Sequence, residues 1–271
     1  MQQLNTLDAP GTKTPGLSLS IASTPEEVKE VQRLRYRVFI EDAGLRTLVN
    51  PSRLDQDEFD PYCDHLIVRD ASNLQVVGTY RVLRPAGANR IGRLYCESEF
   101  ELDRLQHLRG RMVEAGRACI HPGYRSGAVI MLLWAGLAEY MRRHHCEYLI
   151  GCASISLTDG GTNATAVYQQ LAASRHYAPT EYRVHPHLPF PMQKSRQMQP
   201  MQQERRLAEG MLPPLLKGYL RSGAWVCGEP AWDADFHCAD LLVLLPLSNL
   251  DSRYARRYMP SQAQRICVES H

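Results

Sequence analysis

The sequence predicts an α+β fold, with one mixed α/β sheet and helices packed against it. Strand-like and helix-like segments follow one another in the order β-α-β-β-β-α-β-α-β-β, which is typical of a single mixed sheet. The apolar fraction of 44% and the charged fraction of 22% are those of an ordinary globular protein. At 271 residues the chain is long enough to bury a substantial core, and no internal repeat is visible.

The first elements are predicted by alternation and by helix-capping signals. Residues 1–17 are polar and contain two prolines and two glycines, so we expect a disordered tail. Leu17 to Ala22 alternates apolar residues with serine, as a half-buried strand does. Thr24, Pro25 and Glu27 then supply a cap, a first-turn proline and a capping-box acid, which together predict a helix. One domain is expected over residues 18–271.

The central elements are two strands, an unusual third strand and an amphipathic helix. The third strand, at 111–120, places Glu114 and Arg117 among apolar residues. The helix that follows has apolar residues every three or four positions from Ile130 to Met141 and ends in four basic side chains. The other elements are strands at 65–69, 75–83, 147–152, 224–229 and 238–245 and a helix at 162–175.

A basic stretch between residues 183 and 221 interrupts this order. It contains seven Lys or Arg against two Glu, and four of the nine methionines. We expect a long helical insertion there. Its basic face would be either simply solvated or a contact surface for an acidic partner or an anionic membrane.

Composition excludes several classes of protein. The formal net charge is only +2, so nothing indicates a nucleic-acid partner. The longest apolar run, 128–138, is shorter than the roughly 18 residues that a membrane span requires. The first 16 residues lack a basic start followed by an apolar stretch, so we expect no secretory signal, and we expect the eight cysteines to be reduced thiols in the cytoplasm. None forms a Cys-x-x-Cys pair, and we expect neither a metal site nor a cofactor.

Two segments carry the residues suited to chemistry. Residues 41–64 contain seven acids and two arginines, which indicates either a solvated loop or a functional acidic cluster. Residues 113–128 form a strand, a glycine-containing turn and a helix start, whose free N–H groups suit a phosphate or a developing oxyanion. Glu114 and Arg117 would lie on opposite faces of a regular strand, and would act together only if a bulge intervenes.

These residues resemble the GNAT superfamily of N-acyltransferases, and more narrowly the acyl-homoserine-lactone synthases and the ornithine-lipid-type N-acyltransferases. The resemblance implies a GNAT-like central twisted sheet flanked by helices, with a C-terminal extension of helix and strands. The similar segments between residues 18 and 175 are Leu34-Arg35-x-x-Val38-Phe39, Asp57-x-x-Asp60, Gly78-x-x-Arg81-Val82-Leu83 and Glu114-x-x-Arg117. Segments at 149–155, 214–220, 226–231 and 235–245 look specifically like the ornithine Nα-acyltransferases.

The resemblance implies transfer of a 3-hydroxyacyl chain from acyl carrier protein to the α-amine of L-ornithine, which gives lyso-ornithine lipid. An α-amine must lose a proton before it attacks a thioester, and Glu114 is the candidate base. Arg117 or Arg81 would bind the carboxylate of the acceptor. Asp57 and Asp60 would either bind its side-chain ammonium or order the loop. Further substrate contacts are expected from Arg35, Phe39 and Ser154, and oxyanion or donor contacts from Cys119, Ile120, His121, Arg125 and Gly127.

The donor turn departs from that of ordinary GNAT acetyltransferases. Residues 125–128, Arg-Ser-Gly-Ala, replace a longer loop, which favours a carrier-protein donor over coenzyme A. No covalent intermediate is needed, so Cys119 and Cys152 are interpreted as buried small residues and not as nucleophiles. We expect a cytoplasmic protein with peripheral contact to the inner face of an anionic membrane.

Three alternatives remain open from the sequence. The chain could be an N-acyl amino acid synthase that uses glycine or another amino acid, or an acyl-homoserine-lactone-type synthase. A third alternative is a non-catalytic acyl-binding module associated with the membrane. The presence of Glu114, Arg117 and Arg81 favours an enzyme, because a lipid-binding module would not require them.

Overall fold

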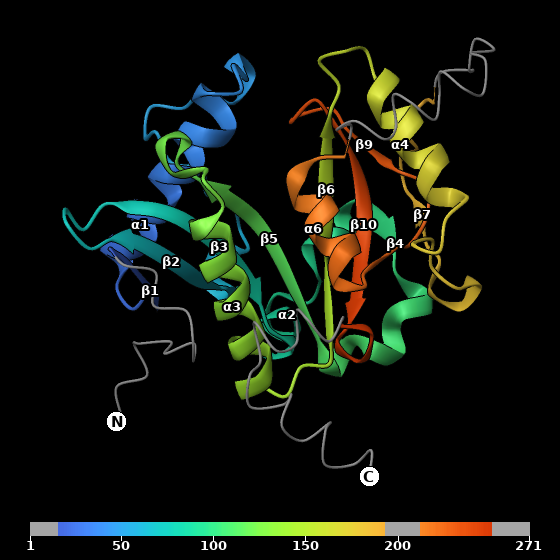
Figure 1. Cartoon of the computed structure of the whole chain (residues 1–271), viewed down its shortest axis with the longest axis horizontal. Helices are drawn as coiled ribbons and strands as arrows, with labels where there is room; N and C mark the ends of the chain where they lie inside the picture. Colours follow the sequence, from blue (N-terminus) through green and yellow to red (C-terminus); the bar gives the residue numbers. More distant parts are fainter. Residues whose placement is uncertain (1–15, 193–211, 251–271) are drawn as a thin grey trace. The chain divides into compact units, whose positions relative to one another are not determined.

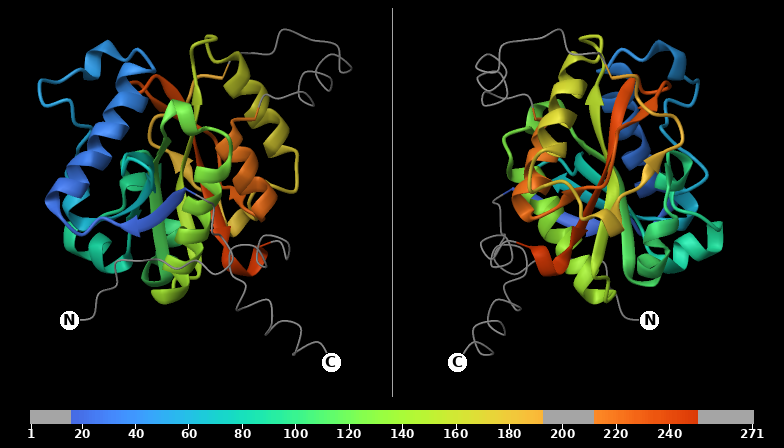
Figure 2. Two further views of the ribbon diagram at one scale, coloured as in Figure 1. Left: turned by 60° about the vertical axis from the view of Figure 1, so that its left-hand side comes forward. Right: turned by 90° about the vertical axis from the view of Figure 1, so that its right-hand side faces the viewer.

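The computed structural model describes residues 16–192 and 212–250, which form two compact units (Figures 1 and 2). The first unit contains residues 16–92 and 111–147, and the second contains residues 93–110, 148–192 and 212–250. The single domain expected over 18–271 stays a prediction. Most of the expected N-terminal tail and residues 193–211 of the expected basic insertion lie outside the described residues.

The first unit contains an antiparallel sheet in the order β1-β2-β3-β5. These strands span Leu17–Ile21, Asp64–Asp70, Val76–Leu83 and Met112–Ile120. Helix α1 (Pro25–Tyr36) contributes Val31 and Leu34 to a core cluster with Ile67. Helix α3 (Ala128–Arg143) packs closely against Gly78, where a side chain would collide with Val129. The two helices cover opposite faces of the sheet (Figure 1).

Helix α1 begins with a side-chain cap and ends in a wider turn. The α1 N-terminus is capped by Thr24, whose hydroxyl accepts from the Glu27 N–H at 3.2 Å. The Glu27 carboxylate turns back over the start of the helix and accepts from the N–H and the hydroxyl of Ser23 at 2.7 and 2.9 Å. Beyond Tyr36 the helix widens into a π-helical turn, Arg37–Glu41. Short 3₁₀ turns follow at Arg46–Leu48 and Asp60–Tyr62, and helix α2 spans Pro85–Ile91.

The second unit is built on β10 (Cys238–Pro246), which is buried at every residue. It pairs antiparallel with β6 (Tyr148–Ser156), β8 (Trp225–Val226) and β9 (Ala231–Asp233). Strands β4 (Phe100–Glu101) and β7 (His185–Pro186) form a separate pair. The helices are α4 (Thr162–Ala172) and α6 (Pro214–Ser222), and 3₁₀ turns lie at Tyr95–Ser98, Asp103–Arg111, Thr180–Tyr182 and Leu247–Asn249.

The mixed α+β class is confirmed, and most predicted elements are present with shifted ends. The strand expected at 147–152 continues to Ser156, because all nine residues pair with β10. The strand expected at 224–229 shrinks to Trp225–Val226, since the chain after it turns to bridge Gly228 to Val184. The sequence missed α2, β4, β7 and β9, all of which are short. Within the described residues, no helix combines the length and the apolar character that crossing a membrane requires.

Candidate active site

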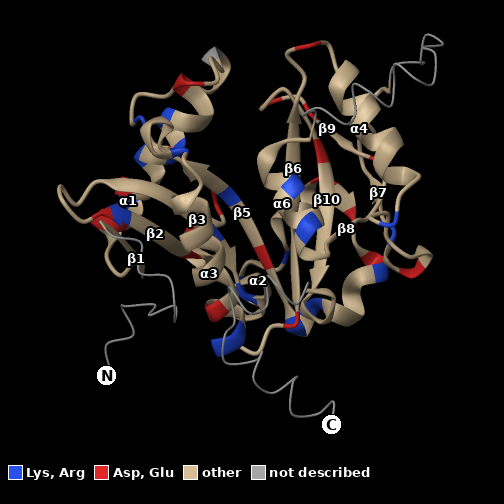
Figure 3. Cartoon of the chain, viewed as in Figure 1, with Lys and Arg blue, Asp and Glu red and all other residues tan. Residues whose placement is uncertain are grey.

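A β-bulge in β5 brings Arg117 to the face of the sheet that carries Glu114. Arg81 of β3 pairs with Gly116 of β5, and Thr79 of β3 pairs with Cys119 of β5. The two pairs are three residues apart on β5 and two apart on β3, so β5 contains one extra residue. Arg117 takes up the extra residue with a left-handed φ of +51°. Figure 3 shows an acidic and a basic position on this strand. Arg117 and Arg81 both contact Asp57, which places Arg117 on the Arg81 and Glu114 side.

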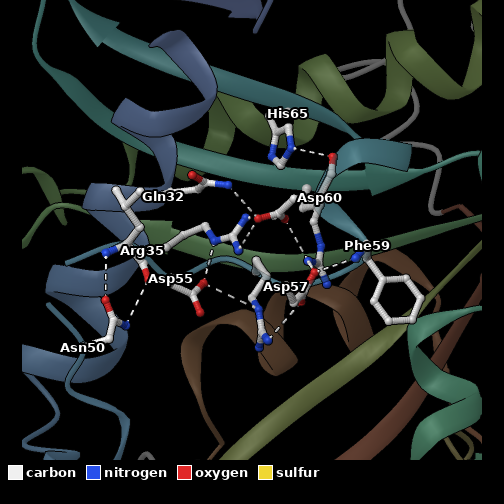
Figure 4. Close-up of polar contacts among 11 residues, drawn as sticks. Gln32, Arg35, Asn50, Asp55, Asp57, Phe59, Asp60 and His65 are labelled. Carbon is white, nitrogen blue, oxygen red and sulfur yellow. Dashed lines mark hydrogen bonds and ion pairs between the residues drawn. The ribbon is translucent and has the colours of Figure 1, made fainter. Parts of the chain in front are cut away.

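A closed ring of six alternating charges lies on this side of the sheet (Figure 4). Its guanidinium groups come from α1, β3 and β5, and its carboxylates all come from residues 55–60. Around the ring the contacts are Arg35 Nε–Asp55 Oδ2 (2.6 Å), Arg35 Nη1–Asp60 Oδ1 (2.9 Å), Arg81 Nη1–Asp60 Oδ1 (2.9 Å), Arg81 Nη1–Asp57 Oδ1 (2.6 Å), Arg117 Nη2–Asp57 Oδ2 (3.4 Å) and Arg117 Nε–Asp55 Oδ2 (3.6 Å).

Four members of the ring (Arg35, Asp55, Asp60 and Arg81) are buried and two (Asp57 and Arg117) are half-buried, so the buried charges depend on their neighbours. The Arg35 side chain is 0% exposed, and Asp60 lies beside it in the core. Burial by itself would raise the pKa of Asp60, but the ion pairs with Arg35 and Arg81 lower it far below its usual range. The pKa of Asp57 is lowered for the same reason, against burial, mainly by Arg81. At neutral pH Asp57 and Asp60 are therefore ionised.

The acidic segment is consequently not a simple solvated loop. Asp60 accepts from Gln32 as well as from two arginines, and its oxygens are occupied within the protein. Asp57 accepts from Arg81 and from the N–H of Phe59. This geometry fits the alternative in which the acids order the loop. Gln32 and Asp55 belong to the network but were not expected from the sequence, because neither lies in a motif.

Glu114 is buried in β5, directly opposite Leu83, with 5% of its surface exposed. Burial raises the pKa of the neighbouring Cys63 thiol to about 12, and the negative charges of Asp60, Glu114 and Asp57 raise it as well. His65 is also buried, with Nε2 at 3.4 Å from the Asp60 carbonyl oxygen, and burial lowers its pKa. A carboxylate, a neutral imidazole and a guanidinium network thus occupy one region of the unit.

The turn after β5 holds the residues expected to contact the acyl donor. His121 accepts from the Gly123 N–H at Nδ1 (3.2 Å), and its Nε2 lies 2.8 Å from Arg37 Nη1. Arg125 is exposed, and Gly127 takes a left-handed φ of +98° as the N-cap of α3. Among the described residues no side chain caps the N-terminus of α3, where the first-turn N–H groups carry the positive end of the helix dipole.

All but one of the remaining predicted site residues lie in the first unit. Cys119 and Ile120 end β5, and burial raises the pKa of the Cys119 thiol, which opposes a nucleophilic role. Phe39 packs against the core cluster of α1. Ser154 is the exception, since it lies on β6 in the second unit, opposite Asp240.

Comparisons with known proteins bear on the class of reaction. A family model described as an acetyltransferase (GNAT) domain matches residues 34–135, which include the ring and β5. The chain is 36% identical over 254 residues to an L-ornithine Nα-acyltransferase of Rhodobacter capsulatus, covering 89% of this chain and 93% of that protein. It is 33% identical to the enzyme of that name from Brucella abortus, over 89% and 88% of the two chains. The chain belongs to the L-ornithine Nα-acyltransferase family. It is an acyltransferase enzyme.

Solved structures support the same fold. The acyl-homoserine-lactone (AHL) synthase LasI matches with a TM-score of 0.50 at 12% identity, over 90% of this chain and 95% of that one. FeeM, an N-acyl amino acid synthase from uncultured soil microbes, matches with a TM-score of 0.51 at 11% identity, over 92% and 99%. At these identities the similarity is one of fold, and the GNAT-like architecture expected from the sequence is confirmed.

Proposed function

We propose that this protein transfers a 3-hydroxyacyl chain from acyl carrier protein to the α-amine of L-ornithine, with lyso-ornithine lipid as the product. The observation that carries the proposal is the bulge that turns Arg117 to the Glu114 face of β5. It supplies a buried carboxylate and a guanidinium on the same side of one strand. The names of the relatives support ornithine as the acceptor.

In the proposed reaction, Glu114 accepts a proton from the α-ammonium group of the acceptor. The free amine then attacks the thioester carbonyl, and the oxygen becomes an oxyanion that N–H groups near Cys119 and His121 stabilise. Collapse of the tetrahedral intermediate breaks the carbon–sulfur bond. The attacking nitrogen gives up its second proton, which the departing thiolate takes up, so the products are an amide and the free thiol of the carrier.

Arg117 is the better candidate for the acceptor carboxylate than Arg81. Both contacts of Arg117 with the ring are long, at 3.4 and 3.6 Å, whereas Arg81 contacts Asp57 and Asp60 at 2.6 and 2.9 Å. Turning Arg117 toward a substrate would therefore break weaker ion pairs than turning Arg81 would. A guanidinium can bind a carboxylate through two parallel hydrogen bonds.

The acyl donor is proposed to be a carrier-protein thioester. The exposed position of Arg125 supports this donor, because acyl carrier proteins are acidic. The short turn at Arg125 to Gly127 supports it too, because such a turn favours a carrier-protein donor over coenzyme A. The basic residues between Lys194 and Arg206, expected to bind the carrier, lie outside the described residues. Charge reversal of Arg205 and Arg206 should raise the KM for the carrier and flatten its salt dependence.

The deciding experiment presents purified protein with 3-hydroxyacyl carrier protein or 3-hydroxyacyl-coenzyme A and with ornithine, glycine or S-adenosylmethionine, and identifies the products by mass spectrometry. N-acyl ornithine from the carrier thioester is expected. N-acyl glycine as the main product would contradict the acceptor, and an acyl-homoserine lactone would assign the chain to the other synthase class. A tenfold preference for the coenzyme A thioester would contradict the donor.

A further inference from the structure

Two cysteine thiols of the second unit lie in contact with each other. Cys152 Sγ is 3.6 Å from Cys96 Sγ, close enough for one thiol to donate a weak hydrogen bond to the other. Cys96 lies in the 3₁₀ turn Tyr95–Ser98, and Cys152 lies in β6. The two residues are 56 positions apart in the sequence, and both belong to the second unit. Folding therefore brings together two thiols that no Cys-x-x-Cys spacing indicates.

The backbone is held in place at both thiols. Cys152 pairs with Leu242 in the antiparallel ladder between β6 and β10. On the other side, the residue after Cys96 is Glu97, whose carboxylate accepts from Arg109 Nη1 at 2.5 Å and so fastens the turn. The two sulfur atoms have to approach by only about 1.5 Å to reach bonding distance, which rotation of the side chains can supply. The contact thus belongs to the folded framework of the unit.

The two thiols differ in their access to solvent. Cys96 is buried, with 1% of its surface exposed, whereas Cys152 is only half-buried. A dissolved oxidant therefore reaches Cys152 first, and Cys96 is placed to attack the Cys152 sulfur once that sulfur has been oxidised. An accessible attacking thiol beside a second, resolving thiol is the arrangement that forms a disulfide under mild oxidation.

We propose that Cys96 and Cys152 form a reversible disulfide by exchange with a low-molecular-weight disulfide such as glutathione disulfide. The Cys152 thiolate attacks one sulfur of glutathione disulfide, whose sulfur–sulfur bond breaks, and one glutathione leaves and takes up the proton that Cys152 released. The Cys96 thiolate then attacks the Cys152 sulfur, and the second glutathione leaves in the same way. Two protein thiols are thus oxidised while one glutathione disulfide is reduced to two molecules of glutathione.

This disulfide would close a long loop of the chain. The chain leaves the second unit after Gly110 and returns to it at Tyr148, and the two cysteines lie on either side of that excursion. A bond between them restricts the unfolded chain more than a bond between near neighbours would, because the entropy of loop closure grows with loop length. The oxidised protein should therefore be more resistant to heat than the reduced protein. Formation of the disulfide does not depend on the acyl-transfer reaction.

The test incubates the purified full-length protein with glutathione disulfide under nitrogen and then maps its disulfides by mass spectrometry of peptides. A cross-link between Cys96 and Cys152 is expected in the wild type, and dithiothreitol should remove it. The oxidised wild type should also melt several degrees above the reduced form. The control Cys146→Ser, at a buried thiol of the first unit, should form the same cross-link.

Two variants separate the steps of the exchange. Cys96→Ser should stop at a glutathione adduct on Cys152, because the resolving thiol is missing. Cys152→Ser should leave Cys96 without glutathione, because that thiol is buried. Neither variant should gain Tm on oxidation. A wild type that keeps both thiols reduced, or that accumulates glutathione on Cys152 without the cross-link, would overturn the disulfide proposed here.

Discussion

At the residue scale, the backbone conformation of Arg117 decides what the strand can do. A non-glycine residue at φ +51° is uncommon, and it costs free energy that neighbouring contacts must offset. Asp55 and Asp57 provide those contacts. The bulge turns two charges that would point to opposite faces into a pair on one face, as the proposed roles of Glu114 and Arg117 require.

Replacing Glu114 with Gln should lower kcat by about 10² to 10⁴ while the fold survives, because the amide keeps the shape and removes the proton acceptor. Raising the pH should partly restore the rate, since more of the free amine then arrives deprotonated. Steady-state kinetics between neutral and alkaline pH, together with a Tm measurement, provide the check. Near-normal kcat in a folded Glu114→Gln enzyme would assign the proton to another acceptor.

Arg117→Lys should raise the KM for ornithine with little change in Tm, because an ammonium group lacks the two-pronged geometry of a guanidinium. Arg81→Lys is the matched comparison. Arg81 is buried between two aspartates, so its replacement should lower the Tm as well. Equal losses of stability in the two variants would show that Arg117 serves the ring alone and does not bind substrate.

At the scale of elements, the charge ring fastens residues 55–60 to α1, β3 and β5. The ion pairs set fixed distances between the acidic segment and these three elements. Breaking a buried pair leaves its partner charged and unsatisfied, which costs more than the pair contributes. The ring therefore holds the bulge and the segment in one arrangement.

Asp60→Asn should lower the free energy of unfolding by about 3–5 kcal/mol at pH 7, as seen by urea denaturation. The control Asp42→Asn, at an exposed position, should change it by less than about 0.5 kcal/mol. The pKa of Asp60 is lower in the folded state, so its contribution is complete above the unfolded value of about 3.9 and is lost as the pH falls below it. The difference between wild type and variant should therefore shrink in acid, and a constant difference would contradict this assignment.

At the scale of the whole molecule, α6 is the described element that bears on membrane contact. Its apolar residues Leu216, Tyr219 and Leu220 are buried, so they cannot also insert into a bilayer. Lys217 and Arg221 remain exposed on the outer side of the helix. Any attachment through α6 would thus be electrostatic, and would weaken as salt is added.

The wild type is expected to float with anionic liposomes and not with neutral ones, and the double variant Lys217→Glu/Arg221→Glu should float less. Both positions are exposed and the core stays intact, so the double variant should have the same Tm as the wild type. Flotation with neither kind of vesicle would end the membrane proposal. Equal flotation of the wild type and the variant would assign attachment to another surface.

Local periodicity and the short motifs around Arg35, Arg81 and Glu114 are enough to predict the class of fold, most of the strands and the family. The sequence also identified a bulge as the condition for Glu114 and Arg117 to act together, without deciding whether one exists. Only the tertiary structure decided that, since a bulge depends on the register between β5 and β3. The same holds for Asp60, a single acid in the sequence to which folding brings two arginines as partners.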